Sequence, residues 1–212
     1  MRRSGILEAL TLRRDRGSTA IASLFQDCPR LSRDAKFIAN PMLNVPYFDQ
    51  LENVDHPMGS CNVSSLAMCL LYLGAKPTTG CRFPDELDAY CDVHQLDRHS
   101  PQDLAKVAAA YGIKDNFKTN ATIAEVKNWV QTKPAIVAGY FTQSGHIICL
   151  IGADDAGFWV NDPYGEYYAD GYDRNDDSND CKGKGLHYSD DLIRRTCMGD
   201  GSFWVHFLEK VS

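Results

Sequence analysis

The apolar residues of this chain form one continuous run and, further on, several short ones. Residues 66–73 read Leu-Ala-Met-Cys-Leu-Leu-Tyr-Leu, and Gly74 follows. A helix of this composition is apolar on nearly every side, so other elements must surround it. The pattern therefore predicts a buried central helix, preceded by the small and polar residues Gly59, Ser60 and Cys61.

Amphipathic segments with capping signals follow this run. Residues 84–111 have a helical pattern, within which Ser100 and Pro101 are typical of a cap and a first helical position. Thr122 and Glu125 have the spacing of a capping box, which predicts one more short helix. This part of the chain is therefore expected to be helical.

Beyond residue 134 the pattern changes to that of strands. Residues 135–141, 146–151 and 158–162 are rich in apolar, β-branched and aromatic side chains, with glycine-containing turns between them. They predict consecutive antiparallel strands. Ser189 is expected to cap a short helix, and residues 203–208 to form a final strand. Helices first and strands afterwards predict an α+β domain, with a cleft between its two halves.

The chain has a basic start and an acidic remainder. Residues 1–40 hold eight Arg or Lys against four Asp or Glu, whereas the net charge of all 212 residues is −6. We interpret residues 1–42 as an N-terminal extension, partly helical or flexible, and residues 43–212 as the main domain. The negative net charge argues against nucleic acid as a partner. We find no signal peptide and no membrane span, and expect a protein that is cytoplasmic as synthesised.

Eight cysteines invite a disulfide or metal interpretation. Cys69 and Cys149 lie in apolar runs, as buried free thiols do, and no Cys-x-x-Cys pair offers half of a zinc site. The sequence leaves open a bridge between Cys181 and Cys197. It also leaves open calcium binding by the oxygen-rich residues 170–180, although their spacing does not match an EF-hand loop. We predict neither a cofactor nor a metal.

Cys61 has the strongest chemical signal, since it stands at the start of the predicted buried helix. The positive end of a helix dipole lowers the pKa of a thiol and favours the nucleophilic thiolate. A cysteine nucleophile also needs a base, a group that orients the base, and donors for an oxyanion. Candidates for each of these lie elsewhere in the chain.

His146 is the best candidate for the base among six histidines. It follows a Gln-Ser-Gly turn and opens an apolar strand, so it is expected at the mouth of a sheet rather than in its middle. His94 and His99 instead flank helices in polar sequence. His206 alternates with apolar residues in the last strand, which is typical of a packed histidine.

The group that orients the histidine is expected in the following strand. If residues 152–156 form the loop of a regular hairpin, His146 lies directly opposite Asp162. A slip of one residue would turn Asn161 toward the histidine instead. An amide can also orient an imidazole, so the pattern favours Asp162 and leaves Asn161 open.

Gln50 lies in an extended segment before Cys61 that is rich in proline and aromatic residues. Its side-chain amide could complete an oxyanion hole together with the backbone N–H of Cys61. Gln143, three residues before His146, is the competing candidate.

Four blocks of the sequence, in this order, resemble a known family. They are Val45-Pro46-Tyr47-Phe48-Asp49-Gln50, Gly59-Ser60-Cys61-Asn62-Val63-Ser64-Ser65-Leu66-Ala67-Met68, Gly145-His146-Ile147-Ile148 and Asn161-Asp162-Pro163-Tyr164-Gly165. They look like the papain-like cysteine peptidases typified by the leader-cleaving domain of bacteriocin ABC exporters, and most like its soluble, stand-alone bacterial and phage branch. The resemblance covers about residues 43–208.

The resemblance implies a papain-like fold with a Cys-His-Asp triad. Cys61 would be the nucleophile, His146 the base and Asp162 the orienting acid, and Gln50 becomes the preferred oxyanion donor. We therefore predict a thiol hydrolase that cleaves amide bonds through an acyl-enzyme on Cys61.

Short peptides, or the peptides of bacterial peptidoglycan, are the expected substrates, as for a phage-type lysin that reaches the cell wall without a signal peptide. Two alternatives stay open. One is an acyltransferase or transpeptidase, in which an amine replaces water as the acceptor. The other is a non-catalytic interaction or virion module that keeps the fold. The sequence does not predict the oligomeric state.

Overall fold

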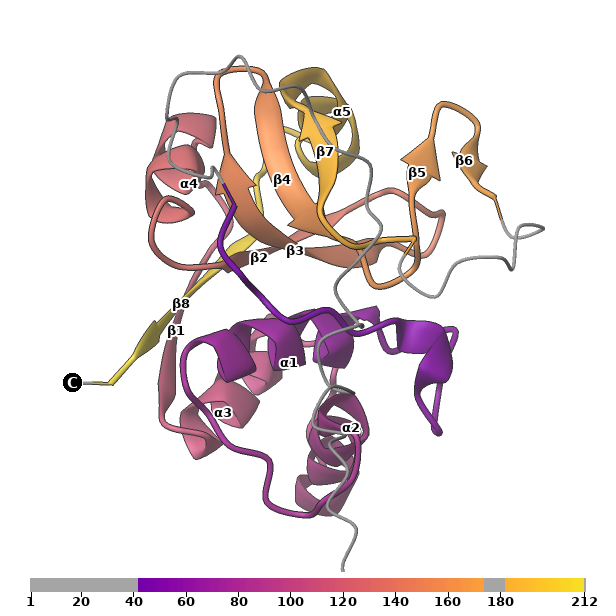
Figure 1. The fold of residues 1–212 in the computed structure, drawn as a ribbon, viewed down its shortest axis with the longest axis vertical. Coiled ribbons are helices and arrows are strands. Elements are labelled where there is room, and N and C mark those ends of the chain that lie inside the picture. Colours follow the sequence, from indigo (N-terminus) through magenta and orange to yellow (C-terminus); the bar gives the residue numbers. More distant parts are fainter. Residues whose placement is uncertain (1–41, 174–181, 212) are drawn as a thin grey trace, which may run out of the picture. The chain divides into compact units, whose positions relative to one another are not determined.

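The computed structural model describes residues 42–173 and 182–211 (Figure 1). They belong to the larger of the two units into which the chain divides, residues 39–212. The predicted N-terminal extension lies outside the described residues except for Met42, so its character stays a prediction. In the described part, no helix is both long enough and apolar enough to cross a membrane.

The elements follow the predicted order of helices before strands, with one strand among the helices. The helices are the 3₁₀ turn η1 (Gln50–Glu52), α1 (Cys61–Tyr72), α2 (Phe83–His94), α3 (Pro101–Ala110), α4 (Ile123–Trp129) and α5 (Asp190–Cys197). The strands are β1 (Ile113–Lys118), β2 (Ala135–Gly139), β3 (His146–Ala153), β4 (Gly157–Asn161), β5 (Tyr167–Tyr168), β6 (Gly171–Tyr172), β7 (Leu186–Ser189) and β8 (Val205–Lys210).

Six of these strands form one antiparallel sheet in the order β1-β8-β2-β3-β4-β7, and β5 pairs with β6 alone. Figure 1 shows α1, α2 and α3 gathered in one half of this unit. The helices α4 and α5 lie in the other half, together with most of the strands. This is the predicted α+β fold with a helical half and an antiparallel β half.

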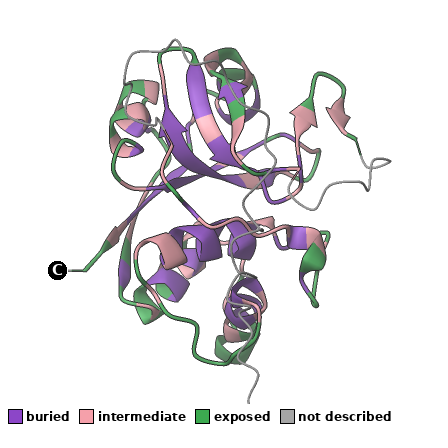
Figure 2. Ribbon diagram, viewed as in Figure 1, coloured by how far each residue is buried: buried purple, intermediate pink, exposed green. Residues whose placement is uncertain are grey.

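The two faces of the sheet bury two different cores. On one face Ile136 and Cys149 pack against α1, whereas on the other their neighbours Val137 and Leu150 pack against α4 and α5. This alternation is the period of two that strands impose on their side chains. Residues 62–70 of α1 are all buried, so the predicted central helix is confirmed (Figure 2).

The predicted helix starts are also confirmed. The hydroxyls of Ser100, Thr122 and Ser189 each accept a hydrogen bond from the backbone N–H three residues further on. Two strands of the large sheet, β1 and β7, had no sequence signal. Their short, partly polar segments become strands because β8 and β4 pair with them, and not because of their own pattern.

The predicted register of the β3–β4 hairpin is wrong. The pairs Ala153–Phe158 and Gly152–Trp159 close a shorter loop than expected, and a bulge then shifts the register between Gly152 and Leu150. Beyond the bulge Leu150 pairs with Val160, so His146 is not directly opposite Asp162. The pairing is offset from the predicted one by two residues. An offset of two keeps every side chain on its expected face.

Candidate active site

Cys61 is the first residue of α1 and is half-buried. Ser60, at the N-cap, makes no side-chain hydrogen bond to the helix. Its hydroxyl instead accepts a hydrogen bond of 2.7 Å from Asn53 Nδ2, which also donates to Ser64 Oγ at 2.9 Å. The start of α1 is therefore tied to the loop that precedes it, and its backbone N–H groups are not covered by the N-cap side chain.

A second set of contacts fixes the same loop to α2. Arg82 donates to Asn53 Oδ1 and, at 2.8 Å, to the carbonyl of Asp49. It also forms an ion pair of 2.7 Å with Glu52. The segment that contains Gln50 is thus attached at both ends to the helical half, next to Cys61.

His146 opens β3 and is 5% exposed. Gly145 before it has a φ of +84°, a conformation that L side chains rarely adopt, and this turn directs the chain into the strand. The Nε2 atom of His146 lies 2.7 Å from Oδ1 of Asp162. Nδ1 is then the ring nitrogen left to interact with Cys61.

Asp162 is completely buried, and four donors hold its carboxylate. Oδ1 accepts from His146 and, at 3.0 Å, from the N–H of Tyr164. Oδ2 accepts from the hydroxyls of Tyr172 and Tyr188, both at 2.9 Å. A buried carboxylate with this many donors is held in a single orientation.

The backbone of Asp162 is packed as tightly as its side chain. Its N–H donates to the carbonyl of Gly183 at 2.7 Å, and its carbonyl accepts from the hydroxyl of Tyr47 at 3.1 Å. A Cβ atom on Gly183 would lie 1.7 Å from the Asp162 carbonyl oxygen, so only glycine fits there. The turn before β7 therefore helps to position the carboxylate.

Asn161, the alternative left open by the sequence, points elsewhere. Its Nδ2 donates to the carbonyls of Val45 and Pro46 at 3.3 and 3.4 Å, and its Oδ1 accepts from the N–H of Gly185. Asn161 thus joins the strand to the segment before η1, and the contact with His146 is made by Asp162.

The electrostatics of the site favour a thiolate beside an imidazolium. Burial alone would raise the pKa of the Cys61 thiol, but the hydrogen bond and charge of His146 and the N–H of Ile147 lower it below its ordinary value of 9.0. Burial would lower the pKa of His146, but the charge and hydrogen bond of Asp162, with those of Cys61, raise it from 6.5 to about 10. Each group therefore stabilises the charged form of the other.

Gln50, the first residue of η1, is buried. Its Nε2 donates to the carbonyl of Pro57 at 2.9 Å, and its backbone N–H donates at 2.8 Å to Pro163, the neighbour of Asp162. An amide nitrogen carries two hydrogens, so one remains for a further acceptor. The competitor Gln143 is exposed on the turn before β3.

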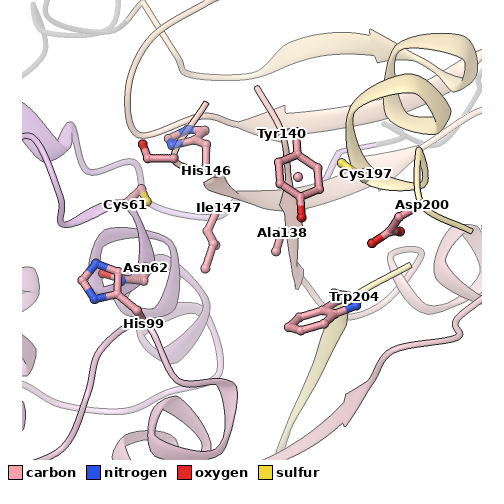
Figure 3. Close-up of a pocket in the computed structure, with 13 residues that line it drawn as sticks. Cys61, Asn62, His99, Ala138, Tyr140, His146, Ile147, Cys197, Asp200 and Trp204 are labelled. Atoms are coloured by element: carbon pink, nitrogen blue, oxygen red, sulfur yellow. The ribbon is translucent and has the colours of Figure 1, made fainter. Parts of the chain in front are cut away.

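A pocket of about 280 Å³ opens next to Cys61 and His146 (Figure 3). Its walls come from both halves of the fold. The other residues that line it are Asn62, His99, Ala138, Gly139, Tyr140, Ser144, Gly145, Ile147, Cys197, Asp200 and Trp204. A space of this volume is large enough for one amino-acid side chain, so the site can hold part of a peptide.

Sequence reasoning missed several residues of this site. Tyr172 and Tyr188 reach Asp162 from strands that had no clear signal, and their hydroxyls gave no indication of a partner. The ring centroids of Phe141, Tyr164 and Tyr172 lie 5.6–6.0 Å from that of the His146 imidazole, and these rings shield it from water. His99 lines the pocket, although its polar surroundings in the sequence made it a poor candidate.

The remaining cysteines show no disulfide among the described residues. Cys69, Cys81, Cys91, Cys149 and Cys197 are free thiols, as is Cys61. Cys181, the suggested partner of Cys197, lies outside the described residues, and so does most of the oxygen-rich loop considered for calcium. In residues 42–173 and 182–211, no group of three or more His, Cys, Asp or Glu side chains could hold a metal ion.

Comparison with known proteins gives one family and a shared fold. The model of the Peptidase_C39 like family matches residues 42–184, which include Gln50, Cys61, His146 and Asp162. No curated protein matches the sequence.

Two solved structures resemble this one at low sequence identity. A double glycine motif protease from an AMS/PCAT transporter, crystallised with its leader peptide, has 17% identity and a TM-score of 0.50, over 82% of this chain and 97% of that one. A C39-like peptidase from Bacillus anthracis has 16% identity and a TM-score of 0.52, over 81% of this chain and 98% of that one. At such identities the likeness establishes the fold, and this fold is the papain-like one that the sequence predicted.

Proposed function

Because this chain belongs to the Peptidase_C39 like family, whose members are cysteine peptidases, we propose that it hydrolyses peptide bonds with Cys61 as nucleophile, His146 as acid and base, and Asp162 as orienting group. The observation that carries the proposal is the contact of 2.7 Å between His146 Nε2 and Asp162 Oδ1 at the start of β3, beside the thiol at the start of α1. This contact leaves Nδ1 for proton exchange with the sulfur and the substrate.

In the first half of the reaction, the Cys61 thiolate attacks the carbonyl carbon of the peptide, and a tetrahedral oxyanion forms. The His146 imidazolium then gives its proton to the departing amine, and the C–N bond breaks. The product is a thioester on Cys61 and a free amine. Asp162 keeps the imidazole in the required orientation and stabilises its charge.

In the second half, a water molecule attacks the thioester. Neutral His146 takes a proton from the water, and the carboxylic acid leaves as the C–S bond breaks. The sulfur departs as a thiolate and His146 is again cationic, so the ion pair of the resting enzyme is restored. Water is consumed once in each turnover.

We assign the oxyanion site to the backbone N–H of Cys61 and the side-chain amide of Gln50. The N-cap side chain does not occupy the N–H groups at the start of α1, and they carry the positive end of the helix dipole. Gln50 is buried and held by Pro57 and Pro163, so its amide needs no reorganisation during the reaction.

The proposed substrates are peptides, including the short peptides of bacterial peptidoglycan. A pocket beside Cys61 that is large enough for one side chain fits a peptide, and a protease of the same fold was crystallised with a leader peptide. The cell-wall substrate rests on the sequence resemblance to the stand-alone bacterial and phage branch, which stays a prediction.

The test is a product profile. Wild-type protein and the variants Cys61→Ala and His146→Ala are incubated with a peptide library and with purified peptidoglycan, and new amino termini are identified by mass spectrometry. We expect cleavage by the wild type and no cleavage by either variant, with all three melting at similar temperatures. Cleavage of peptides alone would reject the cell-wall substrate, and cleavage that survives Cys61→Ala would reject the mechanism.

Thiol alkylation tests the nucleophile without a substrate. Cys81 is an exposed thiol in the same chain and serves as an internal control. At pH 7 we expect iodoacetamide to modify Cys61 at least about 10-fold faster than Cys81, because the contact with His146 favours the Cys61 thiolate. Equal rates at the two sites would contradict the ion pair between Cys61 and His146.

A further inference from the structure

Two exposed aromatic side chains and one carboxylate stand at the end of the pocket that lies away from Cys61. Tyr140 is 68% exposed and Trp204 is 41% exposed, although both are large and hydrophobic. Asp200 lines the pocket with them. Figure 3 shows the three side chains grouped around this end, with Cys61 and His146 at the other.

The backbone contacts of these three residues hold them in place. The N–H of Tyr140 donates to the carbonyl of Thr196 at 2.7 Å, and the carbonyl of Trp204 accepts from Ala138 at 3.2 Å. Asp200 Oδ1 accepts from the N–H of Ser202 at 2.9 Å. The backbones of Tyr140 and Trp204 and the carboxylate of Asp200 are therefore in position before any substrate arrives, which reduces the entropy lost on binding.

The carboxylate of Asp200 is exposed. Within residues 42–173 and 182–211 it forms no ion pair with a basic side chain. The Asp200 carboxylate and the faces of the two rings can therefore all attract a cation at this end of the pocket.

The wall between the two ends is apolar. Ala138 and Ile147 lie along it between His146 and Trp204 (Figure 3). A substrate side chain that lies along this wall packs best with an aliphatic stem. If its end lies beside Asp200, a positive charge there strengthens its binding most. Lysine-like side chains combine both properties, because their methylene groups pack on apolar surface while the ammonium stays at a polar site.

We propose that this pocket is a specificity site for a basic side chain of the peptide substrate, with Asp200 as the ion-pair partner and Tyr140 and Trp204 as a cation-binding pair of rings. The proposal rests on the proposed function and deepens it, since the side chain that occupies the pocket belongs to the peptide that Cys61 attacks. It defines the substrate class as peptides with a lysine-like residue near the scissile bond.

The test compares lysine with norleucine, which has the same stem without the charge. A peptide cleaved in the product profile is resynthesised with lysine, norleucine or glutamate at each position near the scissile bond, and kcat/KM is measured. At one position we expect lysine to be preferred over norleucine by about 10-fold, the combined effect of one ion pair and one cation–π contact. Glutamate should be the poorest of the three.

The same peptides are titrated into Cys61→Ala protein by calorimetry, so binding is measured without turnover. Asp200→Asn in this background should lower the lysine-to-norleucine affinity ratio to near one, and Asp200→Lys should invert the preference toward glutamate. Trp204→Leu should lower the ratio partway. Asp191→Asn, which removes an exposed carboxylate of α5 outside the pocket, should leave the ratio unchanged.

The outcomes separate this inference from the proposed function. Two results would show that the pocket does not select a basic side chain, whether or not peptides are cleaved. One is a lysine-to-norleucine affinity ratio near one at every position in the Cys61→Ala protein. The other is an unchanged ratio after Asp200→Asn. A lysine preference in binding without any wild-type cleavage would support the pocket and reject the peptidase mechanism.

Discussion

Replacing Asp162 with asparagine should lower the alkaline limit of activity. The substitution keeps the size of the side chain but removes the charge that raises the pKa of His146 to about 10. Activity needs the imidazolium, which protonates the departing amine, so kcat/KM must fall as the pH rises through this pKa. Without the charge, the fall should begin at a lower pH.

The size of the shift follows from the contact that is lost. A hydrogen bond to a charged group contributes about 1.5–3 kcal/mol, and one pKa unit corresponds to about 1.4 kcal/mol. The pKa of His146 should therefore fall by about 1–2 units, which moves the alkaline limb of the profile to about pH 8–9. The same loss should reduce kcat/KM at pH 7 by about 10- to 100-fold, less than the loss in Cys61→Ala or His146→Ala.

The substitution also has a structural cost. The hydroxyl of Tyr188 accepts from the N–H of Tyr167 and donates to Asp162. An asparagine –NH₂ in place of Oδ2 cannot accept that proton, so a buried donor loses its partner, at a cost of about 1–3 kcal/mol. Urea denaturation should detect this loss and define the conditions under which the variant is still folded.

The assay is a profile of kcat/KM from pH 5 to 11 on one cleaved peptide. Asp154→Asn is the matched control, because Asp154 contacts His187 at 3.1 Å on the surface and does not line the pocket. The reasoning is refuted if the alkaline limb stays in place in Asp162→Asn, or if Asp154→Asn moves it equally. A fully active Asp162→Ala together with an inactive Asn161→Ala would assign the orienting role to Asn161.

Three further substitutions test the packing and the oxyanion site. Gly183→Ala forces a Cβ against the Asp162 carbonyl and should cost at least about 3 kcal/mol of unfolding free energy by urea denaturation, whereas Gly59→Ala, with no atom closer than 3.9 Å, should be tolerated. Leu66→Asp places an unpaired charge in the core and should leave no folded protein by circular dichroism; a cooperative melt would contradict its burial. Gln50→Ala should lower kcat by about 100-fold with little change in KM, and a loss confined to KM would remove Gln50 from the oxyanion site.

The parts of the fold that the sequence predicted are those with local signals. The run of apolar residues before Gly74 marked the buried helix, and the hydroxyls of Ser100, Thr122 and Ser189 marked helix starts. β1 and β7 had no such signal, since neither segment alternates clearly and each becomes a strand through its partner. The order of β2, β3 and β4 was predicted because hairpins join neighbours in sequence.

The residues of the site also fall into those with a local sequence signal and those without one. Cys61 and His146 could be found because each begins an element with a recognisable pattern, and Asp162 because it directly follows one. Tyr172 and Tyr188, which hold the carboxylate, could not be found, because their contact with Asp162 joins segments without a shared pattern. The pocket residue Tyr140 directly follows β2 and Trp204 directly precedes β8, so the two line one pocket only through the pairing of β2 with β8.

The bulge in β3 has a consequence for how this hairpin can change in length. If the ladder ran regularly from the Ala153–Phe158 pair, Leu150 would lie opposite Asn161, and an amide in place of the carboxylate would share the face of His146. The bulge adds one residue to β3 between Leu150 and Gly152, and this returns Asp162 to the face of the sheet that carries His146. Insertions or deletions between His146 and Asp162 should therefore be tolerated in twos, whereas a change of one residue would need a second bulge or an exchange of residues 161 and 162.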